Sequence, residues 1–465
     1  MHKAFGISWM VDSFRNRCFV PNIHISPRRG WHSLSGSGTL AQAGFIVGFL
    51  PLPYTKDAVM VDFAPRSRLP PPASPAIIVS MKTVLTAERL WDGTQLLDHP
   101  AVVIEDGRIA SISTRAAVEV PSGVLVLDFP GATLAPAFFD VHIHGAKGHD
   151  AMEATPEALD TMSSFLASRG TGNFLATTVT APLDATLRSL SGLAKLVAQP
   201  PIKGQARPVG IHLEGPFLSH AKCGVQPEEH LLAPSTATFD RLFEAAEGHV
   251  RLMTLAPELP GAPELAAHAT ARGVRISLGH SNATAAETLA AIQAGAVSAT
   301  HTCNAMRPLN QREPGILGTV LTCDALYAEM ICDGIHNAPE IVKLWWRAKG
   351  PKRAILMTDA MSAAGMPDGS YTLGGFPVEV AQGRAMARGV LAGSILTLDR
   401  AITNFMEFTG ASLEEALRLA TVNPANMTGL SDQVGSVAVG RAASLVAVDA
   451  AGKLVASVVN GQQVR

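Results

Sequence analysis

Eight short apolar runs, separated by longer segments, constrain the fold of this chain more than any other feature. They lie at residues 134–139, 173–178, 208–213, 250–255, 274–278, 297–300, 327–332 and 354–357. Runs of this length are consistent with strands buried on both faces, as in parallel sheets. Strands that alternate with helices over such a long segment favour a (β/α)8 TIM-like barrel. The alternative is an open, doubly wound sheet, but no GxGxxG motif follows the first run.

Helical patterns lie between several of these runs. The clearest begins at Thr155-Pro156, a capping residue followed by proline at the first helical position. The other patterns cover about 183–197, 239–247, 283–294 and 339–349.

Short strand patterns occur on both sides of this central body. They cover 84–85, 101–105, 109–112 and 124–127 before it, and 444–449 and 456–459 after it. Asp106-Gly107 and Asn460-Gly461 are strong turn signals beside them. We therefore expect a small β-sandwich domain built from residues 81–132 and 426–465, with the barrel at 133–425.

Residues 1–80 differ in composition from the rest of the chain. They mix arginines with a Gly/Ser patch at 33–38 and three prolines at 70–72. The apolar run at 43–52 is too short to cross a bilayer, and no ordered set of targeting signals is present. We expect a poorly ordered extension, upstream of a possible start at Met81.

Charge and cysteine content exclude several classes of protein. Charged residues make up 16% of the chain and the net charge is -2, which gives no reason to expect a nucleic-acid or membrane partner. The five cysteines are scattered and form no CxxC motif. This argues against a disulfide framework and a cysteine zinc site, and it fits a reducing cytoplasm.

Residues of the types that bind metals follow the apolar runs. His142 and His144 end the first run and, two apart on an extended backbone, point to the same side. In a barrel, the carboxyl ends of all strands face one mouth, so the residues after other runs would join them in one site. These residues are Glu214, His280, His301, Asp333, His336 and Asp359. Chance scatter is the alternative, but the shared position after each run favours a divalent metal site.

The sequence around these residues resembles a known family. HLEGPF (212–217), GHSNAT (279–284), THTCNAM (300–306), REPG (312–315), DGIH (333–336) and TDA (358–360) occur in this order. This set is similar to that of the N-acetylglucosamine-6-phosphate deacetylases of the amidohydrolase superfamily. The resemblance runs from about Met81 to the C-terminus. It implies a metal-dependent barrel with a small β domain, and hydrolysis of N-acetylglucosamine 6-phosphate to glucosamine 6-phosphate and acetate.

The resemblance also implies roles for individual residues. Metal ligands fall on Glu214, His280 and His301, and some relatives hold a second ion at positions matching His142, His144 and Asp359. One or two divalent ions, Zn²⁺ or Fe²⁺, are therefore expected. Asp359 matches the general base, which takes a proton from water and returns it to the leaving amine.

Substrate contacts follow from the same resemblance. Arg312 and His336 match phosphate contacts. The other matching positions are Val225, Gln226, Asn304, Ala305, Asp333, Leu391, Ala392 and Gly393. Val225 and Gln226 stand where many relatives have Ala-His, and Cys303 replaces a residue that is often large, so these motifs predict the reaction but do not identify the sugar. Relatives are commonly homodimers, which we also expect here.

Three alternatives remain open. The first is a deacetylase of another phosphorylated N-acetylhexosamine, such as N-acetylgalactosamine 6-phosphate, because Arg312 and His336 do not distinguish sugar epimers. The second is a cyclic-amide hydrolase, but the fourth run is followed by Ala256-Pro257-Glu258, without the bridging lysine such enzymes often use. The third is a non-catalytic scaffold, which should have lost ligands that this chain retains.

Overall fold

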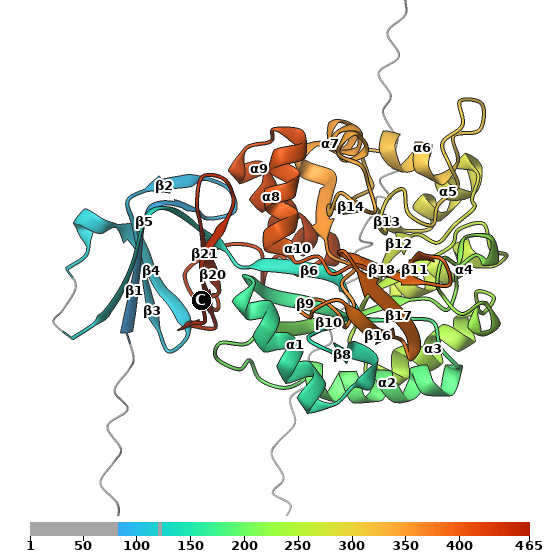
Figure 1. The fold of residues 1–465 in the computed structure, drawn as a ribbon, viewed down its shortest axis with the longest axis horizontal. Coiled ribbons are helices and arrows are strands. Elements are labelled where there is room, and N and C mark those ends of the chain that lie inside the picture. Colours follow the sequence, from blue (N-terminus) through green and yellow to red (C-terminus); the bar gives the residue numbers. More distant parts are fainter. Residues whose placement is uncertain (1–81, 120–122) are drawn as a thin grey trace, which may run out of the picture. The chain divides into compact units, whose positions relative to one another are not determined.

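The computed structural model describes residues 82–119 and 123–465, which belong to one structural unit, Ala76–Arg465 (Figure 1). The extension expected at residues 1–80 lies outside the described residues. None of the helices in the described ranges is long and apolar enough to cross a membrane.

A curled parallel sheet forms the centre of the structure. Its strand order is β13-β12-β11-β10-β9-β6, and all neighbours are parallel. The strands are β6 (Phe138–Ile143), β9 (Thr171–Thr178), β10 (Arg207–Glu214), β11 (Val250–Leu255), β12 (Arg275–Leu278) and β13 (Ala296–Ala299). The second to sixth apolar runs are therefore confirmed as strands, to within two residues at each end.

The last two runs form a further parallel pair, β14 (Ala328–Ile331) and β15 (Ala354–Met357). Backbone hydrogen bonds link this pair to both edges of the sheet. On one side, the Tyr327 N–H donates to the Val297 carbonyl of β13 over 2.9 Å. On the other, the Asp359 N–H donates to the His142 carbonyl of β6 over 2.9 Å, and Ala360 pairs in parallel with Ile143.

The first apolar run is divided between two sheets, so the single strand expected at 134–139 is wrong. Strand β5 (Leu125–Pro136) pairs with β1 (Lys82–Trp91) and β20 (Leu445–Val448), whereas β6 starts at Phe138 and pairs with β9. The Ala137 N–H still donates to the Ser444 carbonyl, but the next N–H donates to Gly170. Both strands are buried here, so hydrophobicity carries no signal of the switch.

Helices lie between the parallel strands, as expected. Helix α1 (Pro156–Ser168) begins after Thr155, whose hydroxyl accepts the Ala158 N–H over 3.2 Å. The other helices with a sequence signal are α2 (Leu183–Val197), α3 (Thr236–Ala245), α5 (Ala285–Gln293) and α7 (Pro339–Arg353). Five helices were not anticipated: α4 (Ala262–Ala271), α6 (Gly315–Thr322), α8 (Leu398–Thr409), α9 (Leu413–Leu419) and α10 (Val422–Thr428).

Strands from both ends of the described chain build a second sheet. Its order is β22-β21-β20-β5-β1-β3-β4, with β2 paired to β1. Its turns Asp106-Gly107 and Asn460-Gly461 have positive φ at both residues, the geometry of type I′ hairpins. Its remaining strands are β2 (Leu96–Asp98), β3 (Pro100–Glu105), β4 (Arg108–Thr114), β21 (Leu454–Val459) and β22 (Gln462–Gln463).

A smaller antiparallel sheet was not predicted from the sequence. It follows β15 and comprises β16 (Gly369–Leu373), β17 (Phe376–Ala381), β18 (Arg384–Ala387) and β19 (Val390–Leu391). Buried and exposed residues alternate along β17, as in a strand with one face in solvent. This sheet matters for function because it contributes to the cavity described below.

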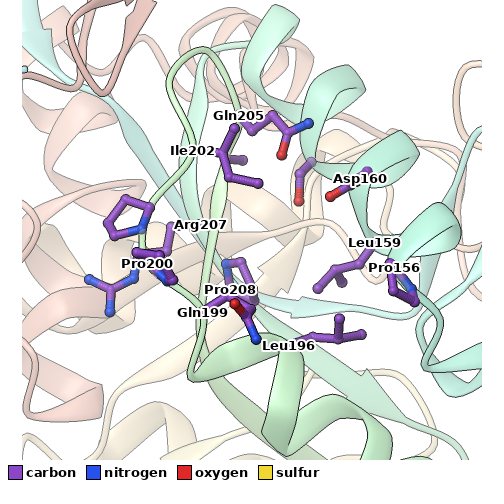
Figure 2. A pocket seen from close by; sticks show the side chains of 13 residues that line it. Pro156, Leu159, Asp160, Leu196, Gln199, Pro200, Ile202, Gln205, Arg207 and Pro208 are labelled. Carbon is purple, nitrogen blue, oxygen red and sulfur yellow. The ribbon is translucent and has the colours of Figure 1, made fainter. Parts of the chain in front are cut away.

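A cavity of about 350 Å³ lies at the amino end of β10 (Figure 2). It is lined by α1, by the segment after α2 and by Arg207 and Pro208 at the start of the strand. The residues expected to bind metal or substrate are not among its lining. Because catalytic residues of such folds lie at the carboxyl ends of strands, this cavity is not the candidate site.

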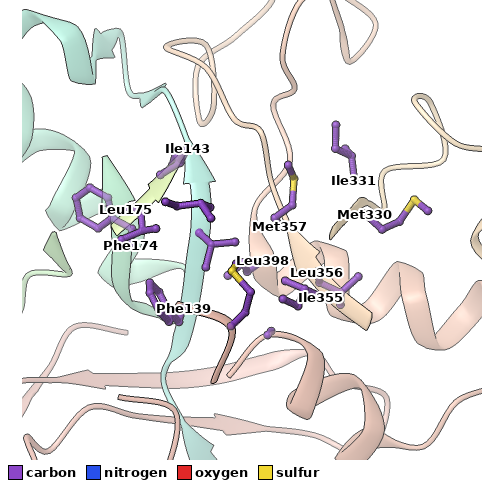
Figure 3. Close-up of a cluster of buried hydrophobic side chains, with 14 of the residues drawn as sticks. Phe139, Ile143, Phe174, Leu175, Met330, Ile331, Ile355, Leu356, Met357 and Leu398 are labelled. Carbon is purple, nitrogen blue, oxygen red and sulfur yellow. The ribbon is translucent and has the colours of Figure 1, made fainter. Parts of the chain in front are cut away.

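The core around the parallel strands is one continuous apolar cluster (Figure 3). The cluster includes Phe139 and Phe174 of β6 and β9, and Met330 and Leu356 of β14 and β15 (Figure 3). All four are fully buried. This packing holds the first and last parallel strands in fixed positions, which places the residues at their carboxyl ends.

Candidate active site

Three of the expected ligand residues occupy equivalent positions after their strands. His280, His301 and Asp359 are each the second residue beyond the end of β12, β13 and β15. Each has a positive φ, of 46°, 30° and 51°, which is uncommon for residues other than glycine. Such backbone strain is concentrated at functional sites, where the surrounding structure supports it. The shared conformation turns all three side chains toward one point.

His142 and His144 reach the same point from β6. Their Nε2 atoms lie 3.1 Å apart. The backbone around them is held by Asp140, whose carboxylate accepts the Thr358 hydroxyl over 2.6 Å and lies 3.3 Å from the His142 N–H. Burial raises the pKa of Asp140 to about 6, and its hydrogen bonds oppose that rise. Asp140 thereby ties the histidine pair to the segment that carries Asp359.

These side chains form two groups with metal-ligand geometry. The first comprises His142, His144 and Asp359, with His144 Nε2 3.1 Å from Asp359 Oδ1. The second comprises Glu214, His280 and His301, with both imidazole Nε2 atoms 3.1 Å from Glu214 Oε1. In each group the ligand atoms lie within 4.8 Å of one another and every residue is buried. Imidazole nitrogen and carboxylate oxygen suit Zn²⁺ and Fe²⁺, so the donor set fits a divalent ion.

Backbone carbonyls orient three of the imidazoles. The Nδ1 atoms of His144, His280 and His301 lie 3.3, 3.0 and 3.2 Å from the carbonyl oxygens of Thr177, Lys222 and Asn304. A carbonyl can only accept, so Nδ1 carries the proton in each contact. In the neutral ring, Nε2 then presents its lone pair to the site, as metal-binding histidines commonly do.

The carboxylates of both groups are ionised. Burial alone would raise their pKa values, but the neighbouring histidines outweigh it: the pKa of Glu214 is held well below its usual range, and that of Asp359 is also lowered. Burial would lower the pKa of His144, yet Asp359 and Glu214 raise it to about 10. In the metal-free protein, His144 is therefore an imidazolium between two carboxylates at neutral pH.

Most of the residues expected to bind substrate line a cavity of about 270 Å³ over these groups. The volume lies near the lower end for ligand pockets. The expected residues that line it are Val225, Gln226, Asn304, Ala305, His336, Leu391 and Gly393. Ligand and substrate positions thus share one cavity at the carboxyl ends of the parallel strands.

Three expected contacts lie elsewhere. Arg312 is exposed on the loop before α6 and is not among the residues that line the cavity. Asp333 lies behind His336: its Oδ2 accepts from His336 Nδ1 over 2.7 Å, and this contact helps to lower the carboxyl pKa against the effect of burial. Ala392 is fully buried beneath its neighbours.

Four further lining residues were not predicted from the sequence. Val179, Gly224, Leu373 and Val390 also border the cavity. Leu373 and Val390 come from the antiparallel sheet β16–β19, which has no counterpart among the eight apolar runs. Alternation of polar and apolar residues along 376–381 was the available signal for that sheet.

A buried chain of hydroxyl groups runs beneath the two ligand groups. His212 Nε2 lies 2.8 Å from the Thr254 hydroxyl, which lies 2.8 Å from that of Thr300. Thr300 donates to Ser277 over 2.7 Å, and Ser277 donates to the Glu329 carboxyl over 3.2 Å. Burial raises the pKa of Glu329 to about 7. These residues come from successive strands, so the chain cross-links the sheet under the site.

Comparisons with known proteins identify the family to which the chain belongs. A sequence model of the amidohydrolase family matches residues 133–464. N-acetylgalactosamine-6-phosphate deacetylase of Escherichia coli O157:H7 is 39% identical over 79% of this chain and 96% of its own length. N-acetylglucosamine-6-phosphate deacetylase of Bacillus subtilis is 37% identical over 79% of this chain and 93% of its own.

A solved structure shows the same similarity. A mutant N-acetyl-D-glucosamine-6-phosphate deacetylase from Mycobacterium smegmatis, in complex with N-acetyl-D-glucosamine-6-phosphate, superposes with a TM-score of 0.76. It is 34% identical, and the match covers 82% of this chain and 99% of that one. The chain therefore belongs to the amidohydrolase family, in the branch that contains the N-acetylglucosamine-6-phosphate deacetylases.

Proposed function

We propose that this protein hydrolyses the acetamide of N-acetylglucosamine 6-phosphate to glucosamine 6-phosphate and acetate, a step of amino-sugar metabolism. The observation that carries the proposal is the pair of ligand groups, His142–His144–Asp359 and Glu214–His280–His301, at the base of one cavity. The named relatives act on phosphorylated N-acetylhexosamines and cover most of the chain.

The two ligand groups would hold one or two divalent ions, Zn²⁺ or Fe²⁺. When bound, such an ion supplies Lewis acidity toward the amide carbonyl and toward water. Asp359 is the catalytic base: its lowered pKa keeps it ionised at neutral pH, so that it can accept a proton from the attacking water. The same carboxyl then returns that proton to the leaving nitrogen as the C–N bond breaks, giving the amine and acetate.

His336 is the phosphate contact that the cavity itself supports. The Asp333 carboxylate accepts from its Nδ1, which fixes the ring, and as an imidazolium the ring would donate from Nε2 to the phosphate. Asn304 and Ala305 border the same space and contact the sugar through side chain and backbone. Val225, Leu391 and Gly393 also line the cavity.

We also infer that the eight parallel strands close into a barrel. The hydrogen bonds from Tyr327 to β13 and from Asp359 to β6 support closure. A separate apolar cluster, which includes Leu85, Ile104 and Leu445, supports a small β-sandwich domain built from 81–132 and 426–465 beside a barrel domain at 133–425, with the boundary moved by β5 to Pro136. A homodimer is proposed from the common state of relatives, and a cytoplasmic location stays a prediction from the sequence.

The decisive experiment measures acetate release by protein stripped of metal and then reloaded with Zn²⁺ or Fe²⁺. N-acetylglucosamine 6-phosphate, its galactosamine epimer and unphosphorylated N-acetylglucosamine are compared. We expect metal-dependent turnover that is fastest for the first. Faster turnover of the epimer would instead favour the activity that names the E. coli relative. No acetate from any of the three by metal-loaded protein would refute the proposal.

A further inference from the structure

Gln226 differs in residue type from the matching position of many relatives. Many relatives carry histidine at this position, among residues expected to touch substrate. Here the glutamine borders the cavity but is only 3% exposed, and both ends of its amide are bound by protein groups. Its carbonyl accepts the backbone N–H of Thr180 over 2.8 Å, and its Nε2 donates to Glu214 Oε2 over 2.8 Å.

The orientation of this amide is fixed by its partners. A backbone N–H can only donate, so the Thr180 contact requires the oxygen of Gln226. The NH₂ group must therefore face Glu214, whose ionised carboxylate can only accept. Thr180 follows β9 and Glu214 ends β10, so one side chain ties together the carboxyl ends of two adjacent strands.

The contact determines how Glu214 presents its two oxygens. Oε1 lies 3.1 Å from the Nε2 atoms of His280 and His301, and Oε2 lies 3.2 Å from that of His144. Oε2 thus faces the first ligand group through His144, whereas Oε1 faces the second group and also lies 3.5 Å from Nε2 of His142. The terminal torsion of a glutamate side chain is broad, so without a directed donor the carboxylate is free to turn away from this arrangement.

We propose that Gln226 is a positioning residue of the metal site: it holds Glu214 so that Oε2 faces His144 while Oε1 faces His280 and His301. The role rests on the proposed metal-dependent function, but it concerns the binding of ions rather than of the sugar phosphate. Glutamine suits it because the amide supplies a donor without adding a charge beside the ions. Partners of metal ligands typically contribute 10- to 100-fold to metal affinity or activity.

The test compares Gln226→Met, which keeps the length of the side chain and removes the donor, with Gln226→His, which restores a ring N–H. Gln199→Met is the matched control, because Gln199 donates only to a carbonyl of α2 at the surface. Metal-free proteins are titrated with Zn²⁺ in competition with a chelator. Metal affinity, kcat and KM are then measured for each.

We expect Gln226→Met to bind at least one ion about 10- to 100-fold more weakly and to lose kcat, with KM changed much less. Gln226→His should recover part of the affinity, and Gln199→Met should match the parent. Unchanged metal affinity with a raised KM would overturn the proposal and make Gln226 a substrate contact. If Gln226→Met does not fold, Gln226→Asn replaces it in the same measurements of metal affinity, kcat and KM. The asparagine side chain is one methylene too short to reach both partners.

The metal titration also separates this inference from the proposed function. If the parent protein binds ions but releases no acetate from any phosphorylated sugar, the proposed function is refuted. The comparison of metal affinities still tests the positioning role of Gln226. Equal affinities in all four proteins would refute the positioning role even when turnover is normal.

Discussion

The Nε2 atom of His144 lies 3.1 Å from Oδ1 of Asp359, which joins the carboxyl end of the first parallel strand to that of the last. The contact depends on the backbone bond from Asp359 to the His142 carbonyl and on Asp140, which holds both segments. Burial and the neighbouring charges set the protonation states of the pair. The carboxylate is ionised, and in the metal-free protein the imidazole holds a proton.

Replacing Asp359 by asparagine tests its role as the base. The amide is nearly isosteric but cannot accept the proton, so kcat is expected to fall at least about 100-fold. Steady-state kinetics on N-acetylglucosamine 6-phosphate check the result, with metal content measured alongside because Asp359 belongs to a ligand group. Near-normal turnover at unchanged metal content would remove Asp359 from the proton transfer.

The raised pKa of His144 predicts that protons compete with metal. Its pKa of about 10 means that the ring is protonated at pH 7 in the metal-free protein, and a ligating nitrogen must lose that proton. Binding at this group should release about one proton per ion at pH 7, and its affinity should rise roughly tenfold per pH unit between pH 6 and 9.

Calorimetric titration with Zn²⁺ in buffers of different ionisation enthalpy measures the released proton. His144→Gln should abolish the release, whereas His149→Gln, which alters a histidine paired with Glu153 outside both groups, should not. A proton release equal in all three proteins would contradict the assignment to His144.

Glu329 is expected to give the metal-free protein a distinct pH dependence of stability. Burial raises its pKa from 4.5 to about 7, so the folded state binds a proton more tightly than the unfolded chain. Its contribution therefore lowers the free energy of unfolding as pH rises from about 4.5 to above 7. The pKa difference corresponds to about 3 kcal/mol.

Glu329→Gln cannot ionise and should lack this dependence. The free energy of unfolding of this variant minus that of the parent should increase by about 3 kcal/mol from pH 4.5 to pH 8. Urea unfolding of both metal-free proteins at several pH values gives the difference, in which groups common to both cancel. A difference that does not vary with pH would show that Glu329 does not titrate in this range.

The parts of the site that could be predicted from the sequence are those with a local signal. His280, His301 and Asp359 each follow a short apolar run, and parallel strands bring such positions to one edge without further information. The turn at Asp106-Gly107 was similarly readable, because only a few residue types accept positive φ at both positions.

The rest depends on contacts that leave no local signal. The change of sheet between Ala137 and Phe138 falls inside an unbroken buried stretch, so no pattern marks it. The bond from Gln226 to Glu214 requires the loop after β10 to fold back onto the end of that strand. The buried Glu329 looks like any surface glutamate until the serines from neighbouring strands are placed around it.

Arg312 provides the sharpest test of phosphate recognition, because sequence and structure point to different places for it. Its motif resembles a phosphate contact, yet in a single chain its side chain is exposed and outside the cavity lining. A guanidinium binds a phosphate through paired, charge-assisted hydrogen bonds. For this contact, a movement of the loop or a second copy of the chain must bring the Arg312 guanidinium to the ligand. Arg312→Ala should then lower kcat/KM for N-acetylglucosamine 6-phosphate by a factor that corresponds to about 2–4 kcal/mol of activation free energy.

Unphosphorylated N-acetylglucosamine cannot make this contact, so its slower hydrolysis should hardly change in Arg312→Ala. Metal content should also be constant, because Arg312 is in neither ligand group. Arg241→Ala, which removes an exposed arginine from α3, is the control for loss of surface charge. Equal losses for both substrates would give Arg312 a role in folding or in the chemical step. No loss for either would mean that His336 and its neighbours in the cavity bind the phosphate without Arg312.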